Sequence, residues 1–90
     1  MSRTIRPTSR FKKDLRLMKR RGKDLDKLEV VVDSLARDVP LVSENRDHNL
    51  RGNWTNHREC HIEPDWLLIY KKVDNELILY RTGSHTDLFD

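Results

Sequence analysis

The chain has 90 residues, of which 36% are hydrophobic and 37% are charged. A chain of this length supports one small core, so residues 1–90 are expected to form a single domain. Its single cysteine, Cys60, excludes an intramolecular disulfide, and no apolar run suits a membrane span or a signal peptide. We therefore expect a cytoplasmic protein without a membrane partner.

The net charge of +3 conceals a separation of charge along the chain. Residues 1–23 carry ten basic side chains and one acidic one, Asp14, which gives +9, whereas the remaining residues carry 8 basic and 14 acidic ones, which gives −6. A basic end on a folded domain suggests a polyanionic partner, most commonly nucleic acid. The same charges would also suit a solvated helix face or a surface for an acidic protein segment.

The first part of the chain predicts a short strand followed by a helix. Residues 2–7 form the strand, which Pro7 ends. Thr8 or Ser9 can cap the helix, and Gly22 stands where a C-terminal cap is expected. The apolar residues of this helix recur at i, i+4 and i+7 spacing: Phe11, Leu15 and Met18.

A second helix follows almost without a loop. Asp24 is its expected N-cap, and Pro40 stops it. Its predicted apolar stripe consists of Leu25, Leu28, Val32, Leu35 and Val39. The short connection indicates that the two helices form an antiparallel hairpin.

The second half of the chain changes to a strand pattern. A polar connection, residues 41–53, precedes strands predicted at 54–62, 66–72 and 76–81, and a tail follows from residue 84. The apolar run in 66–72 is typical of a strand buried on both faces. The predicted fold class is α+β: a short N-terminal strand and a helix hairpin packed on one face of a mainly antiparallel, four-stranded twisted sheet.

Polar residues gather at the edges of these strands. They are His48, His61, Asp65 and His85, with Arg81 nearby in sequence. Imidazoles and carboxylates move protons near neutral pH, and an arginine is suited to a phosphate. Strand ends that lie side by side could bring these groups into one cleft. Each also has a plainer interpretation: the histidines and Asp65 as surface or turn residues, and Arg81 as an ion-pair partner of Asp65 or Glu63.

Several chemistries can be weighed against this set. A hydrolase with a protein nucleophile is disfavoured, because Cys60 and His61 are neighbours on a strand and point to opposite faces. Cys60 is therefore assigned to the core. A zinc site is possible in principle, but the ligand spacing lacks a short His-x-x-x-His pattern. Cleavage of RNA fits best, because the substrate's own 2′-hydroxyl attacks and the protein needs only a base, an acid and a cation.

Aromatic side chains could add base stacking to such a site. Phe89 in the tail is one candidate, and Trp66 at a strand start is another that core packing would explain equally well. Trp54 is assigned to core packing and His57 to the surface.

Three blocks of sequence resemble the RelE/ParE toxin superfamily, and specifically its YafQ-type branch. They are residues 47–54 (DHNLRGNW), 58–70 (RECHIEPDWLLIY) and 80–89 (YRTGSHTDLF), which cover about the last half of the chain. The resemblance implies a RelE-like microbial RNase fold and a ribosome-dependent endoribonuclease that cuts mRNA in the ribosomal A site, as the toxin of a type II toxin–antitoxin pair. It implies no metal and no other cofactor.

The resemblance also suggests roles for the site residues. Family positions map onto His48, His61, Asp65, His85 and Phe89, with Arg81 as an addition. His85 is the expected general acid and Asp65 or His48 the base. His61 would orient the phosphate, Arg81 would stabilise transition-state charge, and Phe89 would position a base.

The resemblance further implies partners. The first helix would face ribosomal RNA through its basic residues Lys12, Lys13, Arg16, Lys19 and Arg20. A cognate antitoxin would neutralise the toxin, and the complex would bind operator DNA through the antitoxin. Two alternatives stay open: a non-catalytic ParE-like toxin that binds DNA gyrase, and a plain nucleic-acid-binding module.

Overall fold

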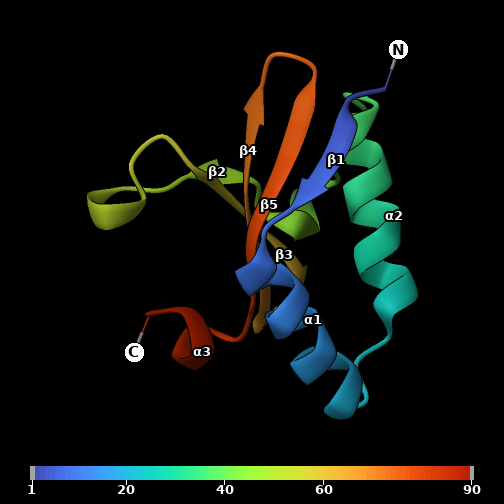
Figure 1. The fold of residues 1–90 in the computed structure, drawn as a ribbon, viewed down its shortest axis with the longest axis vertical. Helices are drawn as coiled ribbons and strands as arrows, with labels where there is room; N and C mark the ends of the chain where they lie inside the picture. Colours follow the sequence, from blue (N-terminus) through green and yellow to red (C-terminus); the bar gives the residue numbers. More distant parts are fainter. Residues whose placement is uncertain (1, 90) are drawn as a thin grey trace.

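The structure of the protein is a computed structural model that describes residues 2–89. Two helices, α1 (Ser9–Arg20) and α2 (Leu25–Ala36), pack against a five-stranded sheet, and a short helix, α3 (His85–Phe89), follows the last strand (Figure 1). The strands are β1 (Thr4–Pro7), β2 (His48–Asn49), β3 (Arg58–Glu63), β4 (Trp66–Val73) and β5 (Glu76–Gly83). Their order in the sheet is β1-β5-β4-β3-β2. The α+β class with a helix pair on a mainly antiparallel sheet is confirmed.

The caps predicted for the two long helices are present. The Thr8 hydroxyl accepts a hydrogen bond from the backbone N–H of Phe11 at 3.0 Å, and the Asp24 carboxylate accepts one from the backbone N–H of Asp26 at 3.0 Å. Such bonds satisfy N–H groups that have no partner within a first helical turn. The helices run in opposite directions, as Figure 1 shows, so the antiparallel hairpin is confirmed.

The end of α2 differs from the prediction. The helix stops at Ala36, and Asp38 adopts a left-handed conformation with φ 56°. Val39 is consequently 45% exposed and does not continue the apolar stripe. The apolar spacing of the helix happens to continue to Val39, although the backbone turns away at Asp38. Periodicity alone does not detect such a turn.

The central strand β4 is buried on both of its faces, as its apolar run predicted. Trp66, Leu68 and Tyr70 pack with the helices in the main core, whereas Leu67 and Ile69 pack with Leu88 on the other face. All five strand residues have an exposed fraction of 0%. Successive side chains of a strand point to opposite faces, so β4 divides the molecule into a helix-covered face and an open face.

Three features of the sheet were not predicted. β1 joins the edge of the sheet by pairing parallel with β5, and β2 adds a fifth strand of two residues within the segment assigned to a connection. The strand expected from residue 54 begins at Arg58, because Gly52–Trp54 forms a 3-10 turn and Asn56 has a φ of 75°. The tail forms α3.

Cys60 is buried in the main core with no exposed surface, as predicted. None of the helices within residues 2–89 combines the length and the apolar character needed to cross a membrane.

Candidate active site

The polar residues gather on the open face of the sheet. Glu59 and His61 lie two positions apart on β3 and therefore share a face, opposite Ile69 and Leu67 of β4 respectively. On the other side of β3, His48 of β2 pairs with Glu59. His85 begins α3, and only Ser84 separates it from Gly83, the last residue of β5.

The aromatic rings form a continuous row across this face. The ring centroids of His48 and His61 are 6.3 Å apart, and those of His61 and His85 are 5.8 Å apart. Phe89 continues the row at 6.3 Å from His85 and is 44% exposed. Three histidines that are distant in sequence thus lie next to one another on one face of the sheet.

Each of the three imidazoles is anchored through Nδ1. His48 Nδ1 donates to the carbonyl oxygen of Arg46 at 2.6 Å, and His61 Nδ1 donates to that of Pro64 at 3.1 Å. His85 Nδ1 lies 2.7 Å from the Asp65 carboxylate. All three acceptors are oxygens without hydrogen, so the proton belongs on Nδ1. In every ring, Nε2 is therefore the atom available to gain or lose a proton.

Asp65 acts on His85 at two points. One carboxylate oxygen accepts the backbone N–H of His85 at 3.0 Å as well as the ring N–H. The pKa of Asp65 is lowered, mainly by the hydrogen bond from the backbone N–H of His85 and next by the hydrogen bond from the His85 ring. Asp65 consequently stays ionised and fixes the orientation of the His85 ring.

Glu59 is the site residue that the sequence interpretation missed. Its side chain has an exposed fraction of 5%, and its carboxylate lies 3.4 Å from His48 Nε2 and 3.6 Å from His61 Nε2. The i, i+2 spacing of Glu59 and His61 on a strand was the available signal. The predicted strand 54–62 already contained both residues, but no motif pointed to Glu59.

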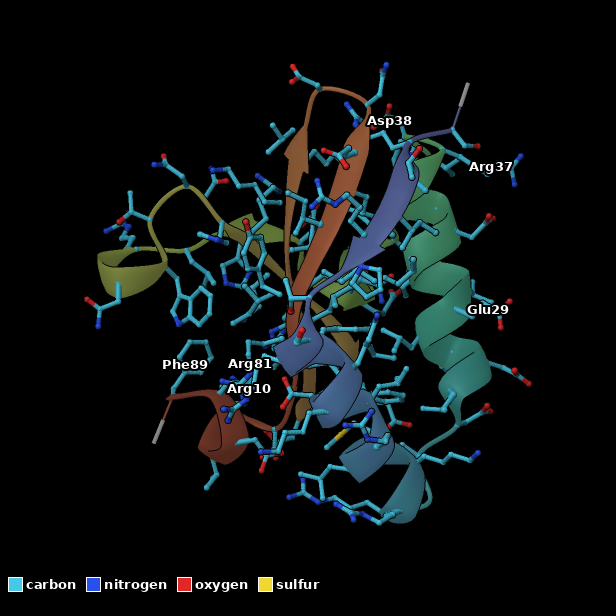
Figure 2. All side chains as sticks on the ribbon, viewed as in Figure 1. Arg10, Glu29, Arg37, Asp38, Arg81 and Phe89 are labelled. Atoms are coloured by element: carbon cyan, nitrogen blue, oxygen red, sulfur yellow. The ribbon has the colours of Figure 1, made fainter. Side chains whose placement is uncertain are left out.

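Two predicted site residues have other surroundings. Trp66 is fully buried, and its indole N–H donates to the Thr82 hydroxyl at 2.9 Å, so the prediction that it stacks on RNA is wrong. Arg81 pairs with neither Asp65 nor Glu63 but with Asp14 of α1, at 2.6 Å and 3.2 Å. Figure 2 shows Arg81 beside Arg10, where β5 approaches α1. Glu63 instead holds Lys23 and Lys27.

A cation could be held at this site. Glu59, His61 and His85 each offer one ligand atom, and these atoms lie within 4.8 Å of one another. One carboxylate and two imidazoles are a donor set that suits zinc or copper.

Two helices on one face of a twisted sheet, with an imidazole–carboxylate site on the open face, define a small toxin of RelE-like fold. The family profile described as "Bacterial toxin of type II toxin-antitoxin system, YafQ" matches residues 3–90. The chain belongs to this YafQ family.

Relatives agree over the whole chain. The mRNA interferase toxin YafQ of Escherichia coli K12 is 40% identical over 90 residues, which span 99% of this chain and 98% of the relative. The toxin in the crystal structure of the E. coli DinJ–YafQ toxin–antitoxin complex is 40% identical, with a TM-score of 0.91 and full coverage of both chains. A metal-bound toxin from Helicobacter pylori is 43% identical, with a TM-score of 0.91 and coverage of 97% and 99%.

Proposed function

We propose that this protein is an endoribonuclease toxin that cuts mRNA in the A site of the ribosome and so inhibits translation. The observation that carries the proposal is the row of three imidazoles on one face of the sheet, each anchored at Nδ1 so that Nε2 is left for proton transfer. Its E. coli relative is named an mRNA interferase toxin, which supports the same activity here.

The proposed reaction is transfer of the scissile phosphate to the adjacent 2′-hydroxyl. A base takes the 2′-hydroxyl proton, the oxygen attacks phosphorus, and the bond to the 5′-oxygen breaks as an acid supplies a proton to it. The products are a 2′,3′-cyclic phosphate and a new 5′-hydroxyl end. No protein nucleophile takes part, in keeping with a cysteine whose thiol pKa is raised by burial.

We assign the acid to His85, whose exposed ring is supported by the Asp65 carboxylate. A carboxylate with a lowered pKa is a weak base, so His48 is a better base than Asp65. His61, buried beside Glu59, would orient the phosphate, and Phe89 would stack on a base. Arg81 would act on phosphate charge from the side of α1.

Replacement of His85 by alanine tests the proposal. On translating ribosomes the parent should yield cut mRNA with 5′-hydroxyl ends, and His85→Ala should reduce the rate by about 100-fold or more, since a general acid contributes 10²–10⁴. His57→Ala is the matched control, because the His57 ring packs between Trp54 and Tyr80. Cutting by His85→Ala at the parental rate would refute the acid assignment, and intact mRNA with the parent would refute the function.

The proposed reaction needs no metal or other cofactor, since acid, base and phosphate contacts come from side chains. The same assay with a chelator checks this, and we expect an unchanged rate. A rate lost with chelator and restored by Zn²⁺ or Cu²⁺ would instead assign the Glu59–His61–His85 cluster to a catalytic ion.

The proposed partners follow from the activity and from the relatives. A cognate antitoxin would bind this chain, as DinJ binds E. coli YafQ, and the complex would contact operator DNA through the antitoxin. Ribosomes would be reached in the cytoplasm. The exposed basic residues of α1 would face ribosomal RNA.

A further inference from the structure

The basic residues of α1 form one broad arc around the helix. At 100° per residue, Arg10, Lys13 and Arg20 lie toward one end of this arc, Lys12 and Lys19 lie at the other end, and Arg16 lies between them. The first set lines a cavity of about 160 Å³ together with Arg81 of β5. Four cationic side chains therefore line one cavity, and Lys12, Arg16 and Lys19 lie outside it.

The acidic residues at this cavity are already paired. Asp14 binds Arg81, accepts the backbone N–H of Thr82 at 3.3 Å, and has Arg10 Nε at 3.6 Å. Asp87 holds Arg21 through two hydrogen bonds of 2.6 Å and 2.9 Å. Within residues 2–89, Lys13 and Arg20 form no ion pair. The cavity thus keeps positive charge that no carboxylate of the described chain offsets.

The cavity adjoins the active site through the chain itself. Arg81 and Thr82 end β5, and Asp87 lies on α3, so the cavity is lined by residues on both sides of His85. Figure 2 shows Arg10 and Arg81 together at the junction of α1 with this segment. An RNA strand crossing the open face at His85 would leave it close to this cavity.

We propose that this cavity binds one backbone phosphate of the substrate RNA strand, outside the scissile bond. The fit is chemical: three guanidinium groups and one ammonium group line the cavity, which suits the single negative charge of a backbone phosphodiester, and arginine forks match phosphate oxygens. Asp14, the one acidic residue of the basic segment, is the positioning residue that holds Arg81 at the cavity wall. The identity of the strand as substrate rests on the proposed function.

The binding test uses a fluorescently labelled single-stranded RNA with 2′-O-methyl groups, which cannot undergo cleavage. Its affinity is measured against salt concentration for the full chain, for the Lys13→Gln/Arg20→Gln variant and for Lys71→Gln/Lys72→Gln, which removes equal charge from β4. We expect the cavity pair to lose about tenfold in affinity and to lower the logarithmic salt slope by about 0.7, the value for one phosphate of a single strand. The β4 pair, which lies outside α1 and outside the cavity, should lose less than about threefold.

Three results would overturn the proposal. Equal losses of RNA affinity for the two variants would indicate that diffuse charge binds the RNA, and absence of RNA binding by the parent at low salt would exclude the site altogether. If the cavity variant kept its RNA affinity but lost affinity for the antitoxin, the cavity would be assigned to an acidic peptide. Circular dichroism checks that the variants are folded. Because the methylated RNA is not cut, the result is independent of the His85 experiment, and failure of either proposal can be recognised separately.

Discussion

Glu59 is the carboxylate closest to the titrating nitrogens of His48 and His61. At 4% exposure it is shielded from water, so its charge acts on both rings more strongly than a surface carboxylate would. It can stabilise the positive charge that develops when either imidazole takes up a proton. We therefore expect proton transfer at the site to depend on Glu59, a residue that no motif singled out.

We expect Glu59→Gln to reduce mRNA cleavage by about 10- to 100-fold, because the amide keeps the shape of the side chain but removes the charge. The rate and its pH dependence are to be measured on translating ribosomes. Glu29→Gln on the exposed face of α2 is the control. An unchanged rate and pH profile for Glu59→Gln would show that Glu59 serves only to fill space beneath the rings.

At the scale of elements, the position of α3 is set by hydrogen bonds in its first turn and by one ion pair with Arg21 at the end of α1. Ser84 and Asp87 exchange side-chain to backbone hydrogen bonds at 2.9 Å and 3.1 Å, which is a capping box. Arg21 joins the same carboxylate from the end of α1 and holds the pKa of Asp87 well below its usual range. Gly83 must stay small, because a Cβ there would lie 2.9 Å from Asp87 Cβ. These contacts place His85 on the open face.

The lowered pKa of Asp87 makes this contact sensitive to acid. The pKa of Asp87 is lower in the folded protein than in the unfolded chain, where it is about 3.9. The ionised carboxylate therefore stabilises the fold at pH values above about 3.9, and this stabilisation is lost as the pH falls towards the pKa of the folded state. We expect Asp87→Asn to lower the free energy of unfolding by about 1–2 kcal/mol at pH 7. The difference from the parent should shrink below about pH 4. Denaturant unfolding of both proteins at pH 7 and below about pH 4 measures this difference in the free energy of unfolding. A difference that does not change with pH would contradict the assignment to an ion pair.

At the scale of the whole molecule, one face of the sheet supplies stability and the other supplies chemistry. The helices cover the face that contains Cys60, Leu68 and Tyr70, whereas the open face keeps a small cluster around Leu67 and Ile69 beside the site. The large apolar burial lies away from the histidines, so changes in the site cost little core packing.

The reactivity of the Cys60 thiol measures how often the whole fold opens. Its side chain is fully buried on the central part of β3, and burial raises the pKa of its thiol. We expect a thiol-specific reagent to label the native protein only at the rate of global unfolding, and to label it at once in denaturant. Labelling within seconds under native conditions would show that β3 opens locally.

The sequence predicted the local elements well and the partners of side chains poorly. Thr8 and Asp24 were identified as caps because capping is decided within one turn. Val39 was wrongly included in the second helix, the start of β3 was placed too early, and the two-residue strand β2 was not predicted. The reason is that a left-handed residue and a very short strand pairing leave no periodic signal in the sequence. Trp66 was ambiguous in the sequence, and burial between sheet and helices decided it.

What the sequence by itself determined is the order of elements and the residue types that carry the chemistry, since spacing and motif are local properties of a chain. What only the tertiary structure decided is which groups meet. Arg81 binds Asp14 across 67 positions, and His85 binds Asp65 across 20. Such contacts arise when α1, β5 and α3 pack together, because only the packed fold brings oppositely charged groups that are distant in sequence within hydrogen-bonding distance.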